Sequence, residues 1–205
     1  EVFLTHGLDS LEHKFVYDHD CFSFINFFYC CQCVYINIEK CKLALGWGDK
    51  NLKWKRIPGS LHGQVEKFKC KNKDNQIVVK GVAKIDERAE TILAYFILYT
   101  SNERNRAHIE INGNTERSWS YAGTTSHTGN VAVETRAPKP ADNRYFDCIQ
   151  VWQKGFNGNP DAIVIAWFSK DNDGYDKMAS GAVVASTTGF IVIEPLAPRV
   201  SNVSL

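Results

Sequence analysis

The sequence lacks the motifs by which common enzyme classes are recognised. It has no phosphate-cradling glycine loop, no G-x-S-x-G nucleophile elbow and no H-E-x-x-H metal motif. It also has no long hydrophobic run, because its longest apolar stretch, Ile92 to Tyr99, is far too short to cross a bilayer as a helix. We therefore expect a protein that is not an enzyme, needs no cofactor and has no membrane span.

An excess of charge of either sign is also absent. The 205 residues carry a formal net charge of +1, with 23% charged and 44% hydrophobic residues. This composition is ordinary for a globular protein and gives no electrostatic reason to expect a nucleic-acid partner. A chain of this length buries roughly 70% of the surface that its extended form exposes, so it does not need disulfides in order to fold.

Boundaries between domains are not marked by any long linker. The simplest division is an N-terminal arm over 1–20, with a short helix at 7–16, and a single all-β domain over 21–205. The chain begins with Glu1 and shows no leader, which is expected of a secreted, extracellular protein whose signal peptide has been removed. Asn202-Val203-Ser204 is a glycosylation sequon, and we expect a glycan at Asn202 on a mobile C-terminus.

Cysteines form the one dense cluster in the sequence. Five of the seven lie between Cys21 and Cys41, in an aromatic segment. Adjacent and alternate cysteines of a regular strand are poorly placed to bridge each other, so their partners are expected elsewhere in the chain. The candidates for disulfides are Cys21, Cys30, Cys31, Cys33, Cys41, Cys70 and Cys148.

These candidates predict that disulfides staple the N-terminal arm to the body near Cys70 and Cys148. Because seven is odd, one thiol stays free or joins another subunit. A metal site made by Cys30, Cys31 and Cys33 with His19 is one alternative, and buried reduced thiols are another.

Most of the chain after Asp20 has the pattern of short strands separated by turns. Dipeptides such as Asn112-Gly113 and Asn157-Gly158 are typical of hairpin turns, and no stretch is helical over the length of a parallel crossover. The expected fold is an antiparallel β-sandwich of the jelly-roll kind, with a β-barrel as the alternative. The predicted strands cover 22–30, 33–38, 41–46, 51–57, 63–71, 76–85, 91–100, 106–112, 115–121, 130–135, 144–153, 162–169, 178–186 and 189–194.

Two of the predicted strands are apolar on both faces. They are TILAYFILYT at 91–100 and AIVIAWF at 162–168. Such strands need a second cover, which we expect to be another layer, a neighbouring copy, a homologous subunit or an apolar small molecule such as a lipid or pigment. Loops and the N-terminal segment are the alternative cover. The leading hypothesis is therefore a secreted, non-enzymatic subunit of an extracellular oligomer that carries an apolar ligand.

A lectin-like carbohydrate-binding module is the alternative hypothesis. Trp119 and Tyr121 share one face of a predicted strand, and Asn112 and Glu116 are polar neighbours in the sequence. An aromatic face with amide and carboxylate partners is the arrangement by which proteins stack and hydrogen-bond sugars.

Three further patterns have simple structural explanations. Asp171, Asp173 and Asp176 would hold any calcium ion in their loop, but the end carboxylates of an EF-hand are missing, so we expect a turn and no metal. Ser126-His127 is expected to be a polar hairpin connection. The lysines at 67, 69, 71 and 73 alternate as on an exposed edge strand, with an anionic partner as the alternative interpretation.

Overall fold

The computed structural model describes residues 38–58, 65–113, 115, 117–122, 126–170, 178 and 180–205. The expected N-terminal arm over 1–20 and the predicted strand over 22–30 lie outside these residues. The described strands all belong to one sheet. They are β1 (Lys55–Ile57), β2 (Val65–Lys71), β3 (Ile77–Ile85), β4 (Arg117–Tyr121), β5 (Thr128–Thr135), β6 (Arg144–Phe156), β7 (Asn159–Ser169), β8 (Val183–Val184), β9 (Thr188–Ala197) and β10 (Val200–Ser204).

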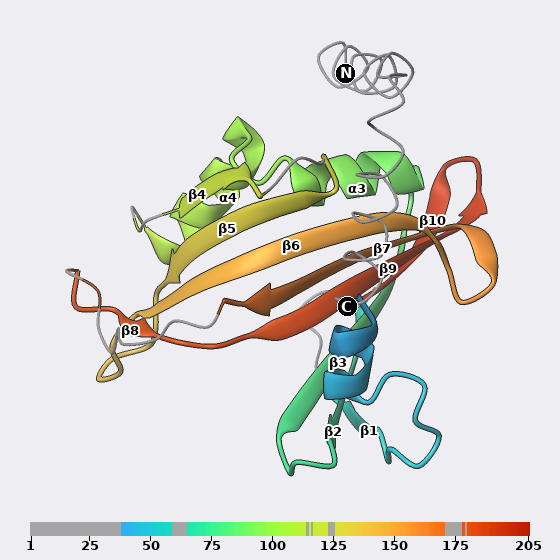
Figure 1. The fold of residues 1–205 in the computed structure, drawn as a ribbon, viewed down its shortest axis with the longest axis horizontal. Coiled ribbons are helices and arrows are strands. Elements are labelled where there is room, and N and C mark those ends of the chain that lie inside the picture. The colour runs from blue at the N-terminus through green and yellow to red at the C-terminus, as the bar shows by residue number, and fades with distance from the viewer. Residues whose placement is uncertain are drawn as a thin grey trace, which may run out of the picture.

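The sheet is open and almost entirely antiparallel (Figure 1). Its strand order is β1-β2-β3-β10-β9-β7-β6-β5-β4, so β1 and β4 form its two edges, while β8 pairs in parallel with β6. The antiparallel, mainly β prediction is confirmed for the described residues. The sandwich, jelly-roll and barrel predictions are wrong, because the described strands make one sheet whose two edges do not pair with each other.

Strands β6 and β7 form the long central hairpin. Their connection passes through Asn157 and Gly158, both with positive φ (50° and 80°). This is the backbone of a turn that matches the twist of the strands, and an asparagine followed by glycine adopts it at low cost. The turn predicted at Asn157-Gly158 is therefore confirmed.

Helical segments cover both sides of the central strands. On one side, called the α3 face, helix α3 (Ala89–Ile97) packs Ile92 and Leu93 against residues of β7 and β9, including Ile165. Helix α4 (Asn102–Asn112) follows α3 along the same side (Figure 1). On the other side, called the 38–45 face, the helical residues 38–45 pack Ile38 and Cys41 against alternate residues of the same strands.

The segment 91–100 is a helix for most of its length and not a strand, so that prediction is wrong. Ile92, Leu93 and Phe96 recur at the three- and four-residue spacing of a helix face, and an apolar run this dense satisfies both periodicities. The other doubly apolar segment, 162–168, does lie in a strand, β7. The two segments contribute to one core, so they cover each other and need no neighbouring subunit at this face.

The predicted strands 106–112 and 41–46 are also helical. Helix α4 begins after Ser101, whose Oγ accepts a hydrogen bond from the Arg104 backbone amide, which is an ordinary N-terminal cap. In the sequence, Ile109 and Ile111 alternate with polar residues, which is typical of a strand with one buried face. In the helix both side chains are exposed, at 51% and 74%, so the alternation does not mark a buried face.

Strand β10 was not predicted, and it changes the position of the glycosylation sequon. Asn202 pairs with Lys84 of β3 and Glu194 of β9, and its Nδ2 donates a hydrogen bond to Glu194 Oε2 at 3.1 Å. The expectation of a mobile segment here is therefore wrong. The nitrogen that would carry a glycan is already engaged in the sheet, and the glycan itself stays a prediction.

Two strand glycines on the α3 face each lie beneath a tryptophan. A Cβ at Gly129 would lie 2.5 Å from Trp119 Nε1, and a Cβ at Gly189 would collide with the Trp167 ring. Glycine in a strand interior often marks such a close approach. Both indole rings can therefore pack directly on the backbone of the neighbouring strand.

We expect Gly129→Ala and Gly189→Ala each to lower the free energy of unfolding by about 1–3 kcal/mol, since the added methyl group must displace a tryptophan ring. Gly81→Ala is the matched control, because a Cβ there has only Val65 Cγ1 nearby, at 3.9 Å. Equilibrium unfolding in urea measures all three variants. Equal stability of the Gly189 and Gly81 variants would contradict the close packing of Trp167 on Gly189.

Candidate functional site

Three tryptophans lie on the α3 face and are called the tryptophan floor: Trp119 of β4, Trp152 of β6 and Trp167 of β7. Strand register puts them on this face, because Trp152 pairs with Ile165 and both pack in the core beneath α3. Each floor tryptophan is only partly buried. Part of each indole is therefore accessible beside the part of the sheet that α3 covers.

A hairpin turn holds one end of this floor. The His127 ring stacks on Trp152 with 4.1 Å between ring centroids, and His127 Nδ1 lies 3.2 Å from the Trp152 carbonyl oxygen. Trp152 Nε1 in turn donates to the Ser126 carbonyl oxygen at 3.2 Å. The predicted structural role of Ser126-His127 in a hairpin connection is consistent with these contacts.

An apolar pocket opens at the other end of the floor. It has a volume of about 370 Å³, and Trp167 shares its wall with Trp47 and Trp54 from the opposite side of the sheet. Lys80 Nζ lies 5.2 Å from the centre of the Trp47 ring and 5.9 Å from that of Trp54. This pocket is called the tryptophan pocket.

The pocket lies between β3 and β9, next to Gly81 and Leu205. The pairing of β10 with β3 and β9 ends at Ser204, and Leu205 exchanges two backbone hydrogen bonds with Gly81. The pocket lies beside these residues and is lined by Val79 of β3 and Phe190 of β9 among others.

Two arginines and a tyrosine form a second polar-aromatic group on the α3 face. The guanidinium carbons of Arg104 and Arg117 lie 4.6 Å and 3.9 Å from the centre of the Tyr99 ring. Arg104 Nη1 donates to the carbonyl oxygens of Tyr95 and Phe96 at the end of α3, and Arg117 Nη1 donates to the Arg104 carbonyl oxygen. These bonds join the end of α3, helix α4 and the edge strand β4.

A neighbouring histidine is fully hydrogen-bonded as a neutral ring. Thr115 donates its hydroxyl proton to the Glu134 carbonyl oxygen, so its Oγ1 accepts from His108 Nε2 at 2.8 Å. Asn112 Nδ2 lies 3.2 Å from His108 Nδ1, which accepts this bond. Burial, together with the charge of Arg117, lowers the pKa of His108. His108 therefore adds no charge to this group at neutral pH.

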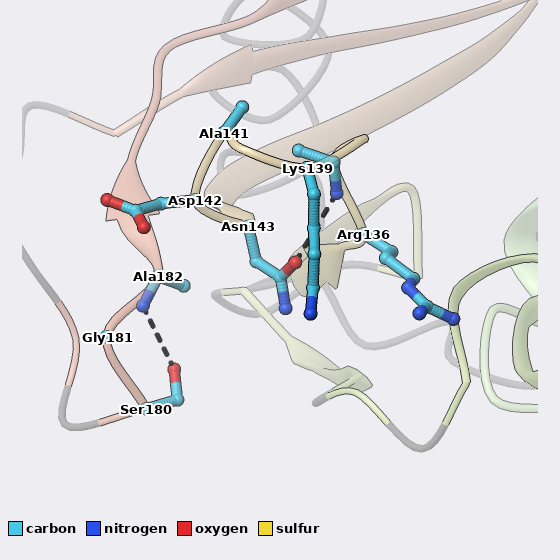
Figure 2. A pocket seen from close by; sticks show the side chains of 9 residues that line it. Arg136, Lys139, Ala141, Asp142, Asn143, Ser180, Gly181 and Ala182 are labelled. Atoms are coloured by element: carbon cyan, nitrogen blue, oxygen red, sulfur yellow. Dashed lines mark hydrogen bonds between the residues drawn. The ribbon is translucent and has the colours of Figure 1, made fainter.

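A polar pocket of about 300 Å³ lies between the loop at 136–143 and Ser180 to Ala182 (Figure 2). Beneath it, the buried Glu134 carboxylate accepts hydrogen bonds from Asn143 Nδ2 at 2.7 Å and Ser180 Oγ at 2.9 Å. Asn143 Oδ1 also accepts from the Ala137 amide. These polar groups bind one another, which gives the pocket a structural role in joining the two loops.

The predicted carbohydrate residues are only partly brought together. Trp119 and Tyr121 do share a face, with ring centroids 4.6 Å apart, and Tyr121 is 65% exposed. Asn112 instead lies in α4, where it bonds His108 and accepts from the Arg136 amide at 3.0 Å. Glu116 lies outside the described residues.

The predicted calcium loop, with Asp171, Asp173 and Asp176, lies outside the described residues as well. Within the part of the chain that the structure describes, no three histidine, cysteine or acidic side chains gather as a metal site. No helix of that part is long and apolar enough to span a membrane.

The lysine row is in the sheet but not at its edge. Lys67, Lys69 and Lys71 lie in β2, which pairs with both β1 and β3. Lys69 and Lys71 are exposed and face the same side as Val79 and Ile77, their partners in β3. The edge-strand explanation is therefore wrong, because β1 lies outside β2.

The expected disulfide staple is not supported. Cys41, Cys70 and Cys148 are free, buried thiols, and Cys21, Cys30, Cys31 and Cys33 lie outside the described residues. Cys41 packs in the core of the 38–45 face, whereas the strand register puts Cys148 on the α3 face. These thiols act as small apolar core residues, which explains their burial without a bridge.

No family model and no curated protein matches this sequence. Solved structures do match its fold. Human StAR-related lipid transfer protein 5 aligns with a TM-score of 0.59 and 14% identity, covering 85% of this chain and 78% of its own. The human StarD13 (DLC2) lipid transfer and protein localization domain aligns with a TM-score of 0.56 and 14% identity over 76% of this chain and 74% of its own.

A bacterial structure shows the same likeness. The STAR-related lipid transfer protein fragment from Xanthomonas axonopodis aligns with a TM-score of 0.55 and 14% identity, covering 74% of this chain and 78% of its own. At these identities the likeness defines the fold. The chain has the helix-grip fold of START domains, not a jelly roll or a closed barrel.

We expect the described thiols to be reduced and slow to react in the folded protein. Burial raises the pKa of the Cys41 thiol to about 11 and also raises that of Cys148, so little of the reactive thiolate forms at neutral pH. Iodoacetamide should modify both only after unfolding, without any reductant, as read by peptide mass spectrometry. A non-reduced, disulfide-linked peptide containing Cys70 or Cys148 would contradict the free-thiol assignment.

We expect mild acid to destabilise the fold through His127. Burial lowers its pKa, while the hydrogen bond to Trp152 opposes this, so the unfolded chain binds a proton that the folded chain releases. The free energy of unfolding should then fall as the pH drops below the ordinary histidine value of 6.5. His127→Phe keeps a ring over Trp152 and should give a shallower decrease between about pH 7.5 and pH 5.5, measured by urea unfolding. His108 contributes in the same direction and remains in this variant. An unchanged slope would contradict the role of His127.

Proposed function

We propose that this protein is a non-enzymatic binding protein for a lipid-like, apolar small molecule. The ligand lies on the tryptophan floor and enters the tryptophan pocket. The observation that carries this proposal is the pocket itself: about 370 Å³ of space walled by Trp47, Trp54 and Trp167. That volume falls within the range of small-molecule sites, which are mostly apolar and contain few polar groups.

The contacts of the floor explain how it would select an apolar ligand. Gly129 and Gly189 let Trp119 and Trp167 lie on the sheet, so that their ring surfaces offer a broad contact area. Each indole that a ligand covers contributes through area removed from water, at roughly 25 cal/mol per Å². A flat apolar molecule or an acyl chain fits such a surface better than a strongly hydrated one.

The solved structures with this fold support the proposal. Their names describe lipid transfer, in human proteins and in Xanthomonas axonopodis. The carbohydrate alternative has less support, because Asn112 is engaged by His108 and Arg136. Secretion and assembly into an oligomer are separate proposals that the ligand site does not require.

Native mass spectrometry of the purified 205-residue chain tests this function. The protein is incubated with oleyl alcohol, methyl oleate, cholesterol or phosphatidylcholine, and we expect a one-to-one complex with at least one of them. Binding constants then come from the change in tryptophan fluorescence. Absence of any complex, together with binding on a glycan array, would contradict the proposal and favour the carbohydrate alternative.

A pair of neighbouring substitutions locates the ligand. Trp167→Leu removes a wall of the pocket and should weaken binding by about tenfold, the effect of losing a large aromatic contact. Phe168→Leu is the matched control, because Phe168 packs on the opposite, 38–45 face. An equal loss of affinity in both variants would show that the effect comes from stability and not from contact with the ligand.

A further inference from the structure

One edge of Arg117 is buried without a hydrogen-bond partner. Its Nη1 donates to the Arg104 carbonyl oxygen at 3.1 Å. Its Nε and Nη2 each expose less than 1 Å² to solvent and have no hydrogen-bond partner among the described residues. Buried donors without partners are rare in folded proteins and cost free energy, so such an edge calls for an explanation.

The unpartnered edge is the one with which arginine binds an oxyanion. The Nε and Nη2 hydrogens of a guanidinium point in parallel, so they form two hydrogen bonds to the two oxygens of a carboxylate or phosphate. Arg117 Nη1 is engaged on the other side. The side chain is therefore held in place, while its two-donor edge has no partner in the described part of the chain but is covered, so an anion that binds this edge must displace the groups that cover it.

The positive charge of this group is not neutralised by the described residues. Their ion pairs, such as Lys170 with Asp147, do not include Arg104 or Arg117. Burial lowers the pKa of Arg104 and of Arg117, and the charge of Arg117 lowers that of Arg104 further. Both side chains nevertheless stay charged, as arginine does throughout the physiological range.

Tyr99 between them does not supply a negative charge. Burial raises its pKa, against the effect of the two guanidinium groups, so the ring remains a neutral phenol at neutral pH. Its face offers both cations a favourable contact, at 4.6 Å and 3.9 Å, but cation–π contacts only partly replace an anion. Two cations that share one aromatic ring favour an anionic partner.

The group lies along the same face as the proposed ligand site. Arg117 is two residues from Trp119 on β4, and strand alternation puts both on the α3 face. Trp119 lies three strands from Trp167, a separation of roughly 14 Å at the usual interstrand spacing. The path from Arg117 over the floor to the tryptophan pocket is on the order of 20 Å, which suits a long acyl chain.

We propose that the ligand is a single-chain amphiphile with an anionic head group, held by the Nε–Nη2 edge of Arg117, with its chain on the tryptophan floor. This inference rests on the proposed function. Arg104 is a positioning residue, because its carbonyl oxygen orients Arg117 and its charge adds to the attraction for the anion. Carboxylate and phosphate head groups share the required chemistry.

Binding of matched ligands to the full chain tests this proposal. Oleate and methyl oleate have the same chain, but only oleate is charged, and acetate has the charge without the chain. Two charge-assisted hydrogen bonds predict that oleate binds at least tenfold more tightly than methyl oleate, and that acetate does not displace it at similar concentrations. Oleyl phosphate forms a second arm, and tighter binding than oleate would assign a phosphate head group.

Substitutions of the arginine then assign the contact. Arg117→Lys keeps the charge but loses the two-donor edge, so oleate should bind about tenfold more weakly while methyl oleate is unaffected. Arg106→Lys is the matched control, because Arg106 is exposed on α4 and undergoes the same change of side chain. The control should leave the preference for oleate unchanged.

The outcomes separate this inference from the function on which it rests. Equal affinity of the wild-type protein for oleate and methyl oleate would overturn the head-group assignment and leave apolar binding in place. Displacement of oleate by acetate at similar concentrations would show a simple anion site and also overturn the inference. Absence of binding by both oleate and methyl oleate would overturn the inference and count against the proposed function. If the Arg117→Lys variant does not fold, Lys80→Gln separates the two cations: loss of the preference for oleate in this variant would place the head group at Lys80, in the tryptophan pocket, and overturn the inference.

Discussion

The central strand β7 buries both of its faces, and the arrangement of the other elements follows from that constraint. Ile163 and Ile165 face α3, while Val164 and Ala166 face the helical residues 38–45. A strand with no polar face must be covered twice, since each exposed aliphatic side chain would cost roughly 1.5–3 kcal/mol of hydrophobic stabilisation. One sheet with helices on both sides meets this requirement within a single chain.

The site uses the part of the sheet that these helices leave accessible. The glycines at 129 and 189 leave room for tryptophan rings to lie on the sheet, and a pocket opens beside Trp167 between β3 and β9. Two buried donor atoms of Arg117, Nε and Nη2, lack hydrogen-bond partners among the described residues, next to the same surface. An apolar floor with a guanidinium at one end, whose Nε and Nη2 have no partner among the described residues, has the character of a site for an amphiphile.

Much of the sheet could be predicted from the sequence, because its strands alternate or end at turn residues. Asn157-Gly158 is one such turn, and the shared face of Trp119 and Tyr121 followed correctly from a period of two. Helix α3 could not be distinguished from a strand by its apolar run alone. Periodicity is ambiguous where nearly every residue is apolar, and only the packing of Ile92 and Leu93 on β7 and β9 decides it.

The arginine group could not be predicted, because Tyr99, Arg104 and Arg117 lie in different parts of the chain and share no sequence pattern. Tyr99 was assigned to a strand, whereas Arg104 lies in the first turn of a helix capped by Ser101. Arg117 shares the two-residue alternation that puts Trp119 and Tyr121 on one face of the strand. This alternation was the one sign of the arginine group in the sequence. The disulfide prediction is not supported for a related reason, because the spacing of cysteines in a sequence does not show whether a thiol is buried and reduced.

Quenching of tryptophan fluorescence by a dibrominated stearate tests the central claim most directly, because bromine quenches only the rings that it approaches. The test uses the Trp47→Phe, Trp54→Phe double variant, in which the tryptophan floor supplies all the remaining tryptophans. The structure predicts saturable quenching of most of this emission, and loss of the saturable part when methyl oleate or oleate competes. Binding of the brominated chain without quenching of the floor tryptophans would contradict the proposed position of the ligand.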